Sequence, residues 1–215
     1  ETLAEIDLPS ELNNIVYCAE TNQVICSSRQ GHIWKIVASE NLKGRGPAKP
    51  TMEFEVLKKD PTAEMNMGGE GDHLLRVYSM DKTAGLLGVS QQGKLFMWHL
   101  HPTFQSHLEL DCLYHVGNCS KSLFLHYKRT NPGSLCADDV KRLEIEDGDM
   151  LIVGGDEQIC FVNPYDLERP CIRRLDFREG VRALTQWRNL VMVGTKCGLI
   201  IGIDPFSGVH QLKLQ

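Results

Sequence analysis

The sequence has no long hydrophobic run and no excess of positive charge. No stretch approaches the roughly 20 apolar residues of a membrane-spanning helix, and the net charge over 215 residues is −5. General nucleic-acid binders and binders of anionic membranes both need a dense positive field. We therefore expect no membrane insertion and no general affinity for nucleic acid, although a local basic patch stays open.

Motifs that carry common catalytic or ligand chemistry are also missing. No Gly-x-Ser-x-Gly nucleophile turn occurs, and the glycine-rich residues 68–71 lack the Lys and the following helix of a phosphate-binding loop. The densest group of metal-ligand types lacks the paired spacing of zinc sites; it comprises His99, His101, His107, Cys112, His115 and Cys119. We expect no enzyme activity, no cofactor and no metal.

The cysteines favour a reducing compartment. Three of the eight (Cys26, Cys160 and Cys197) lie in or beside apolar segments, where a buried thiol acts as a small apolar side chain. This usage predicts an intracellular protein of the cytoplasm or nucleus. A secreted protein with disulfides is the alternative, because Asn118-Cys119-Ser120 fits a glycosylation acceptor.

The sequence does contain one pattern that recurs four times. An apolar segment, a small residue, a tight polar turn and a second apolar segment occupy residues 24–36, 86–98, 150–162 and 190–203. These short segments, rich in Val, Ile, Leu, Phe and Trp, are typical of strands, and helical periodicity is scarce. Because a single such unit cannot bury its apolar faces, the repeat predicts an array of stacked units.

Each repeated pair has a further expected strand on both sides. The more polar strands that precede the pairs are expected at residues 14–19, 74–80, 140–145 and 181–187. The outer strands that follow them are expected at residues 52–57, 107–110, 172–177 and 209–214. Four antiparallel strands per unit form a propeller blade. Residues 1–215 are therefore predicted to be all-β, as the blades of a β-propeller.

The spacing of the units indicates insertions. Corresponding turn residues Gly31, Gly93, Glu157 and Gly198 lie 62, 64 and 41 residues apart, against a usual blade period of ~40–45. Long insertions are expected near residues 40–50, 60–72 and 113–138. Loops of that length are often functional, so they are candidate partner contacts.

The expected strands exceed the number that complete blades can hold by one. Residues 3–8 form a spare strand beside about four complete blades. We therefore expect an incomplete ring, completed by missing chain or by a partner, since an open sheet edge invites aggregation.

The second unit carries a resemblance to a known family. Gly71-Asp72-His73, Ser90 and residues 93–98, which end in Trp98, resemble a WD40 repeat. In that family a His, a Ser or Thr, an Asp and a Trp form a hydrogen-bonded network. The resemblance implies such roles for His73, Ser90 and Trp98, while Gln91 and Gln92 stand where the Asp is expected. The Trp-Asp dipeptide is absent throughout, so the chain is similar to a divergent WD40 propeller.

That resemblance implies a non-catalytic scaffold, a propeller subunit of an intracellular multiprotein complex whose partners are other protein subunits. Such propellers bind proteins at the loops of one face. The rim residues that correspond to these loops are Arg29, Asp72, Gln92, Asp156, Arg178 and Lys196.

Two other functions stay open. A propeller that contributes to RNA or DNA binding would use local basic residues; these are Lys121, Lys128, Arg129, Arg173, Arg174 and Arg182. Residues 121–129 also alternate apolar and polar side chains, as a half-buried edge strand does, and that interpretation is favoured. An enzyme that uses the central channel is the weakest hypothesis, because no set of acid, base and nucleophile stands out.

Overall fold

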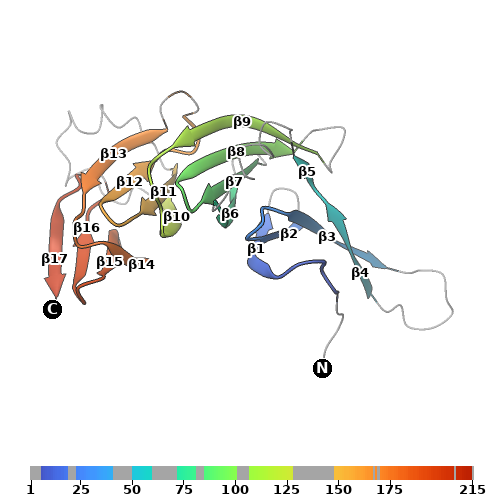
Figure 1. The fold of residues 1–215 in the computed structure, drawn as a ribbon, viewed down its shortest axis with the longest axis horizontal. Helices are drawn as coiled ribbons and strands as arrows, with labels where there is room; N and C mark the ends of the chain where they lie inside the picture. The colour runs from blue at the N-terminus through green and yellow to red at the C-terminus, as the bar shows by residue number, and fades with distance from the viewer. Residues whose placement is uncertain are drawn as a thin grey trace. The chain divides into compact units, whose positions relative to one another are not determined.

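The structure is a computed structural model of the chain, shown in Figure 1. It describes residues 6–18, 23–40, 50–59, 72–80, 85–100, 107–127, 148–166, 168, 170–205 and 207–214. These residues form 17 strands and no helix. Nothing in this part of the chain is a helix long and apolar enough to cross a membrane.

The first half of the chain forms two sheets. Sheet A has the strand order β1-β2-β3-β4, with the bounds Leu12–Cys18, Gln23–Ser28, Ile33–Glu40 and Pro50–Val56. Sheet B has the order β5-β9-β8-β7-β6. Its strands are β5 (Lys58–Lys59), β6 (Leu74–Met80), β7 (Gly85–Ser90), β8 (Lys94–Leu100) and β9 (His107–His115). The short β5 pairs with β9 in parallel.

The second half repeats the plan. Sheet C has the order β10-β11-β12-β13, with the bounds Lys121–Tyr127, Gly148–Gly154, Gln158–Val162 and Cys171–Asp176. Sheet D has the order β14-β15-β16-β17, with the bounds Val181–Trp187, Leu190–Thr195, Ile200–Ile203 and His210–Leu214. Both are antiparallel. Four sheets of strands in chain order are those of propeller blades, as the repeat predicts.

The turns between the second and third strands require glycine. Gly93 and Gly198 occupy this turn in sheets B and D with φ of 78° and 83°. Residues with a Cβ adopt this left-handed region at a cost, and glycine does not. In these two copies of the repeat the glycine thus fixes where one strand ends and the next begins.

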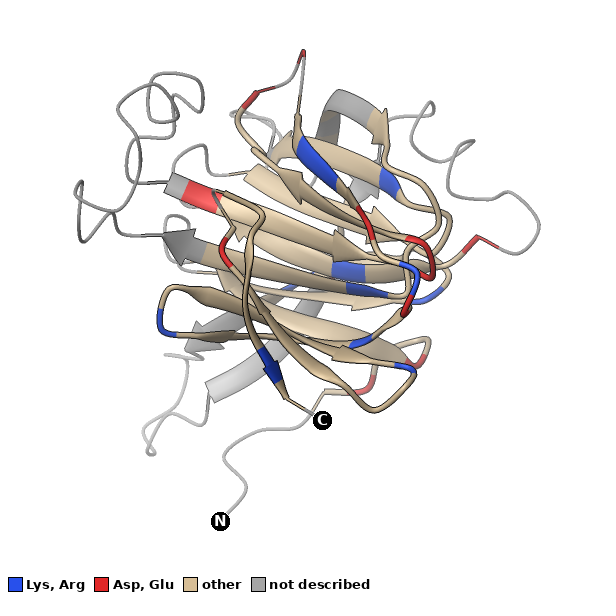
Figure 2. Ribbon diagram, turned by 90° about the vertical axis from the view of Figure 1, so that its left-hand side faces the viewer, with Lys and Arg blue, Asp and Glu red and all other residues tan. Residues whose placement is uncertain are grey.

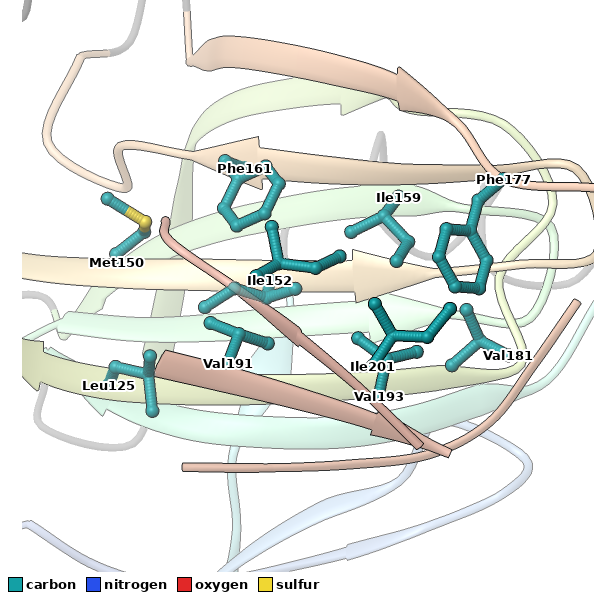
Figure 3. Packing of buried hydrophobic residues seen from close by; sticks show 11 residues of the cluster. Leu125, Met150, Ile152, Ile159, Phe161, Phe177, Val181, Val191, Val193 and Ile201 are labelled. Carbon is teal, nitrogen blue, oxygen red and sulfur yellow. The ribbon is translucent and has the colours of Figure 1, made fainter. Parts of the chain in front are cut away.

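The chain divides into two compact units. Unit 1 contains sheets A and B, and unit 2 contains sheets C and D together with the turn at residues 91–94. The unit 1 core packs Ile25 and Ile33 of sheet A with Phe96 and Trp98 of sheet B. In unit 2, Phe161 of sheet C belongs to the same buried cluster as residues of β15 and β16 (Figure 3). Each core therefore lies between two sheets.

Two strand expectations were wrong. The first strand of sheet C is β10, at residues 121–127, and not residues 140–145. Because β10 and β12 flank β11 on its two sides, no place beside β11 remains for another strand. Residues 140–145 lie outside the described residues, whereas 121–127 fall within the stretch expected to be an insertion. The favoured interpretation of residues 121–129 as a half-buried strand is confirmed for 121–127.

The expected spare strand also fails where it is described. Residues 6–8 of the predicted 3–8 form no strand. The four sheets described are still consistent with an incomplete ring. The expected insertions at 40–50 and 60–72 lie almost wholly outside the described residues.

Candidate functional site

The candidate site is the loop surface of unit 2. We use this name for four connections: residues 116–120, 155–157, 177–180 and 196–199. They join β9 to β10, β11 to β12, β13 to β14 and β15 to β16. Three of the residues expected at a binding rim lie here, namely Asp156, Arg178 and Lys196.

Backbone hydrogen bonds connect these loops from one sheet to the next. The Val181 amide donates to the Gly155 carbonyl at 3.0 Å, and the Ser120 amide donates to the Gly154 carbonyl at 2.9 Å. The Lys196 amide donates to the carbonyl of Gly180 at 3.0 Å. Because these are main-chain bonds, the loops are held in place whatever side chains they carry.

The turn at residues 91–94 also belongs to this network. The Val116 amide donates to the Gly93 carbonyl at 2.9 Å, and the Cys119 amide donates to the Gln91 carbonyl at 2.8 Å. Gln92 is half-buried in the same turn. Of the rim residues expected from the sequence, Gln92 is therefore the fourth that lies in unit 2.

An ion pair joins two of the expected rim residues. Lys196 Nζ lies 2.6 Å from Asp156 Oδ1, with side-chain exposures of 40% and 64%. Arg178 lies between these two residues in the sequence, in the loop that joins β13 to β14, and it is exposed. In Figure 2 basic and acidic segments lie beside one another along such loops. The loop surface therefore presents both signs of charge to solvent.

A cleft opens beside the ion pair. Its volume is about 560 Å³, and its lining comprises His115, Gly117, Asn118, Asp156, Glu157, Gln158 and Asp176. The Gln158 side-chain amide donates to the Val116 carbonyl at 2.6 Å, which fixes one wall. Three carboxylates and one imidazole make this cleft acidic, and a basic or amide-rich segment would suit it.

Glu157 and Asp176 were missed as candidate residues. The signal for Glu157 was available, because it follows Asp156 in a turn already assigned to the rim. Asp176 ends β13, and its approach to the β11–β12 turn depends on the pairing of Gln158 with Asp176 in the sheet. That pairing cannot be seen in the local sequence.

The rim assignment of Asp72 was wrong. Asp72 is 6% exposed, and Ser90 Oγ donates to its Oδ2 at 3.1 Å. A buried carboxylate needs such donors, and its place in the packing of unit 1 removes it from the surface. Arg29 is exposed in the β2–β3 turn of that unit, where its carbonyl accepts from the Leu74 amide at 2.9 Å.

The hydrogen-bonded network implied by the WD40 resemblance forms only in part. Ser90 takes part, and its carboxylate partner is Asp72 and not a residue of the following turn. His73 is exposed. Trp98 is buried with its ring stacked on Phe96 at 5.3 Å, and no described residue accepts a hydrogen bond from its Nε1.

The basic residues of the nucleic-acid alternative are divided between strands. Lys121 begins β10, whereas Arg173 and Arg174 lie on β13, at the opposite edge of sheet C. Arg173 Nη1 donates to the Ser207 carbonyl, so its guanidinium already has a partner. Arg182 lies on β14. Lys128 and Arg129 lie outside the described residues.

The potential metal ligands do not assemble in the described part of the chain. No three His, Cys, Asp or Glu side chains there are arranged to hold an ion. His101 lies outside this part. His115 instead lines the acidic cleft, and Cys119 is buried, with Sγ 3.1 Å from the Lys121 carbonyl.

Two cysteines of sheet C influence each other. A hydrogen bond with the Cys160 side chain lowers the pKa of Cys171 to about 6, assisted by the Arg174 charge and opposed by burial. The same hydrogen bond, together with burial, raises the pKa of Cys160. Six described cysteines are free thiols: Cys18, Cys26, Cys119, Cys160, Cys171 and Cys197.

Comparisons with known proteins support the fold. No protein-family model and no curated protein matches the sequence. A chain of a mitotic checkpoint complex is 12% identical with a TM-score of 0.55, covering 94% of this chain and 50% of that one. BBS1N, solved in complex with ARL6DN, is 14% identical with a TM-score of 0.53, covering 94% and 51%. BamB from Moraxella catarrhalis is 10% identical with a TM-score of 0.56, covering 98% and 52%.

These likenesses show a β-propeller fold. Each solved chain is similar over nearly all of the present chain, whereas the present chain spans about half the length of each. At such low identity the resemblance concerns the arrangement of strands and not the side chains that bind. The fold predicted from the repeat is confirmed.

Proposed function

We propose that this protein is a non-catalytic scaffold that binds other proteins through the loop surface of unit 2. The observation that carries the proposal is an exposed surface of mixed charge on loops fixed by main-chain hydrogen bonds. Two of the similar structures come from protein assemblies: a mitotic checkpoint complex and BBS1N with ARL6DN. A preformed surface also loses little entropy on binding.

The charges favour a protein partner over nucleic acid. Nucleic-acid surfaces concentrate Lys and Arg on one face. The loop surface instead places Lys196 against Asp156, beside a cleft that contains Glu157 and Asp176. Complementary charges of both signs give specificity and fix the register between two proteins. We further propose an intracellular location, which the free thiols of the described cysteines support.

The test is affinity purification from cells with quantitative mass spectrometry. We expect the double variant Asp156→Lys, Arg178→Glu to lose at least one protein that the unaltered chain retains. Both positions are exposed, so the fold should persist. Arg188→Glu is the control, because Arg188 is also exposed but lies in the turn between β14 and β15, at the opposite end of β15 from the loop at residues 196–199.

Two outcomes would contradict the proposal. If the loop variant and the control retain the same proteins, the loop surface is not the binding site. If the retained proteins disappear after nuclease treatment and with rising salt, nucleic acid mediates the association and the nucleic-acid alternative gains support.

A further inference from the structure

Two thiols of sheet C lie on neighbouring strands and on the same face. Cys160 lies on β12 and Cys171 is the first residue of β13, and these strands pair antiparallel. Cys171 lies opposite Val162. Residues directly opposite each other in a ladder share a face, and so do residues two apart on one strand, such as Cys160 and Val162. Both thiols therefore project from one side of the sheet.

An irregularity in the pairing lies beside the two thiols. The register shifts between Phe161 and Val162, so Ile172 has no direct partner on β12. A bulge of this kind increases the local twist of the strands and changes the direction of nearby side chains. The side chains of Cys160 and Cys171 form a hydrogen bond with each other, so their sulfur atoms are neighbours.

The two thiols differ in their access to solvent. Cys160 is 1% exposed, and its Sγ also lies 3.6 Å from the Val116 carbonyl oxygen. Cys171 is half-buried, so a small solute can reach its sulfur atom from water. Reversible oxidation to a disulfide needs one accessible thiol that reacts first and a second thiol beside it that closes the bond. This pair supplies one thiol of each kind.

The surroundings of Cys171 stabilise its negative charge. The hydrogen bond with the Cys160 side chain has the largest effect, the Arg174 guanidinium adds to it, and burial opposes it; together they lower the pKa of Cys171 to about 6. Arg174 is well placed for this role, because it lies directly opposite Cys160 on the same face. The thiolate is the nucleophilic form of cysteine, and at neutral pH Cys171 is mostly in that form.

We propose that Cys171 is a site of reversible oxidation by hydroperoxides, and that Cys160 converts the oxidised thiol into an intramolecular disulfide. The contact between the two thiols across β12 and β13, the exposure of only one of them, and the adjacent Arg174 carry the proposal. It goes beyond the proposed scaffold function and is independent of it, since neither cysteine lies on the loop surface of unit 2.

In the first step the Cys171 thiolate attacks one oxygen of the hydroperoxide. The sulfur–oxygen bond forms while the oxygen–oxygen bond breaks, and the second oxygen leaves with the electron pair and takes a proton from water. Cys171 becomes a sulfenic acid. Its sulfur has lost two electrons, and the peroxide has gained the same two.

In the second step the Cys160 sulfur attacks the Cys171 sulfur. The sulfur–sulfur bond forms, the sulfur–oxygen bond breaks, and the hydroxyl group leaves as water with the proton of Cys160. With hydrogen peroxide, two thiols and one peroxide thus give one disulfide and two waters. A disulfide of ~2.05 Å requires the sulfur atoms to move closer together, and the first residue of a strand can adjust more easily than one in its middle. A dithiol reverses the bond by exchange.

The test treats the purified protein with hydrogen peroxide at neutral pH. The protein is then unfolded with an alkylating agent that blocks the remaining thiols, and peptide mass spectrometry locates the products. Proteolysis after Glu168, which lies between the two cysteines, separates their peptides unless a disulfide joins them. We expect the joined pair in the unaltered chain and its separation by dithiothreitol. Cys160 should lose its free thiol in step with Cys171, although it is buried.

Three serine variants separate the roles of the cysteines. Cys160→Ser should leave Cys171 as a sulfenic acid that dimedone labels, with complete loss of the joined pair. Cys171→Ser should protect Cys160 from oxidation, because no accessible thiol then lies beside it to react first. Cys197→Ser is the matched control, because Cys197 is exposed but lies in the loop between β15 and β16; the yield of the joined pair should not change. Circular dichroism checks that each variant folds, and Cys160→Ala replaces Cys160→Ser if that variant does not.

Three results would overturn the proposal. One is a Cys171 that keeps its free thiol at a peroxide concentration that oxidises Cys197. Another is a sulfenic acid at Cys171 with no bond to Cys160 in the unaltered chain, which would mean that the two sulfur atoms do not approach closely enough. The third is a bond from Cys171 to any other cysteine, within one copy or between two. The proteins retained by the loop surface do not enter this measurement, so its failure leaves the scaffold proposal standing.

Discussion

β7 and β15 occupy the same place in the repeat and differ in burial. All six residues of β7 in sheet B are buried, whereas in β15 of sheet D buried residues alternate with half-buried ones. Both strands are apolar along their length. Apolar character on both sides of a strand predicts two covered faces, so the difference lies in what covers sheet D and not in its composition.

The test of this contrast with the largest expected effect compares two tryptophans. Trp98 of sheet B is fully buried and stacked on Phe96, while Trp187 of sheet D is 49% exposed with the Arg188 guanidinium 4.8 Å from its ring centroid. Trp98→Ala should lower the free energy of unfolding by about 3–5 kcal/mol. Trp187→Ala should change it by no more than about 1 kcal/mol.

Urea denaturation of dilute protein measures both changes. Equal losses in the two variants would mean that Trp187 is packed as closely as Trp98, and the contrast between the two sheets would fail.

A second test compares the glycines of corresponding turns. Gly93 and Gly198 both have positive φ, but a Cβ at Gly93 would fall on the carbonyl of Gly117, while a Cβ at Gly198 would meet nothing within 4 Å. Gly198→Ala should cost about 1–2 kcal/mol from backbone conformation alone. Gly93→Ala should cost about 3 kcal/mol, since the neighbouring loop must also move.

Thermal or urea unfolding resolves this difference. The contrast is contradicted if the two alanine variants are equally stable, because the β7–β8 turn would then be as free of neighbours as the β15–β16 turn.

The sequence was enough to identify the strand pairs but not their surroundings. The strand–turn–strand pattern of β7–β8 and β15–β16 is local, because apolar runs and a turn glycine are contiguous in the chain. Whether Met192 or Ile200 meets solvent depends on a sheet that packs on it from elsewhere. The same limit explains sheet C, where residues 121–127 and 140–145 both suit a strand and only pairing with β11 selects the first.

The candidate site was predictable to a similar extent. Asp156 and Lys196 were expected at the rim because they lie in turns, and the turns place them in contact. Asp72 resembled them in sequence, as a polar residue between strands. Its burial depends on Ser90, 18 residues away, and no local pattern reports that contact.

A third test compares a buried thiol with a half-buried one in unit 2. Burial raises the pKa of Cys119 to about 12, whereas the hydrogen bond with Cys160 lowers that of Cys171 to about 6. Iodoacetamide should therefore modify Cys171 at neutral pH, with a rate that is half-maximal near pH 6, and leave Cys119 unmodified. Peptide mass spectrometry at several pH values reports each site. In Arg174→Gln the half-maximal rate for Cys171 should move to higher pH.

The lowered pKa of the Cys171 thiol also makes the free energy of unfolding depend on pH. Between about pH 6 and its ordinary pKa of 9.0, Cys171 is deprotonated in the folded chain and protonated in the unfolded one. The unfolded state then binds more protons, so this group makes stability rise with pH in that interval. Cys160 acts in the opposite direction above pH 9.0, because its pKa is raised. A Cys171→Ser variant that keeps the full rise would contradict this assignment.

The smallest expected effect is the difference in coupling energy between two ion pairs whose side chains differ in exposure. Asp156 and Lys196 are 64% and 40% exposed, so their double-mutant cycle should give a coupling below about 0.5 kcal/mol that added salt removes. Lys35 of sheet A lies 3.2 Å from Glu55, with side-chain exposures of 9% and 44%, so that coupling should be larger, up to about 1 kcal/mol, and less sensitive to salt. Weak coupling at the loop surface is what a binding role requires, because both charges can then exchange partners at little cost. A strong, salt-resistant Asp156–Lys196 coupling would instead make the pair a structural clamp.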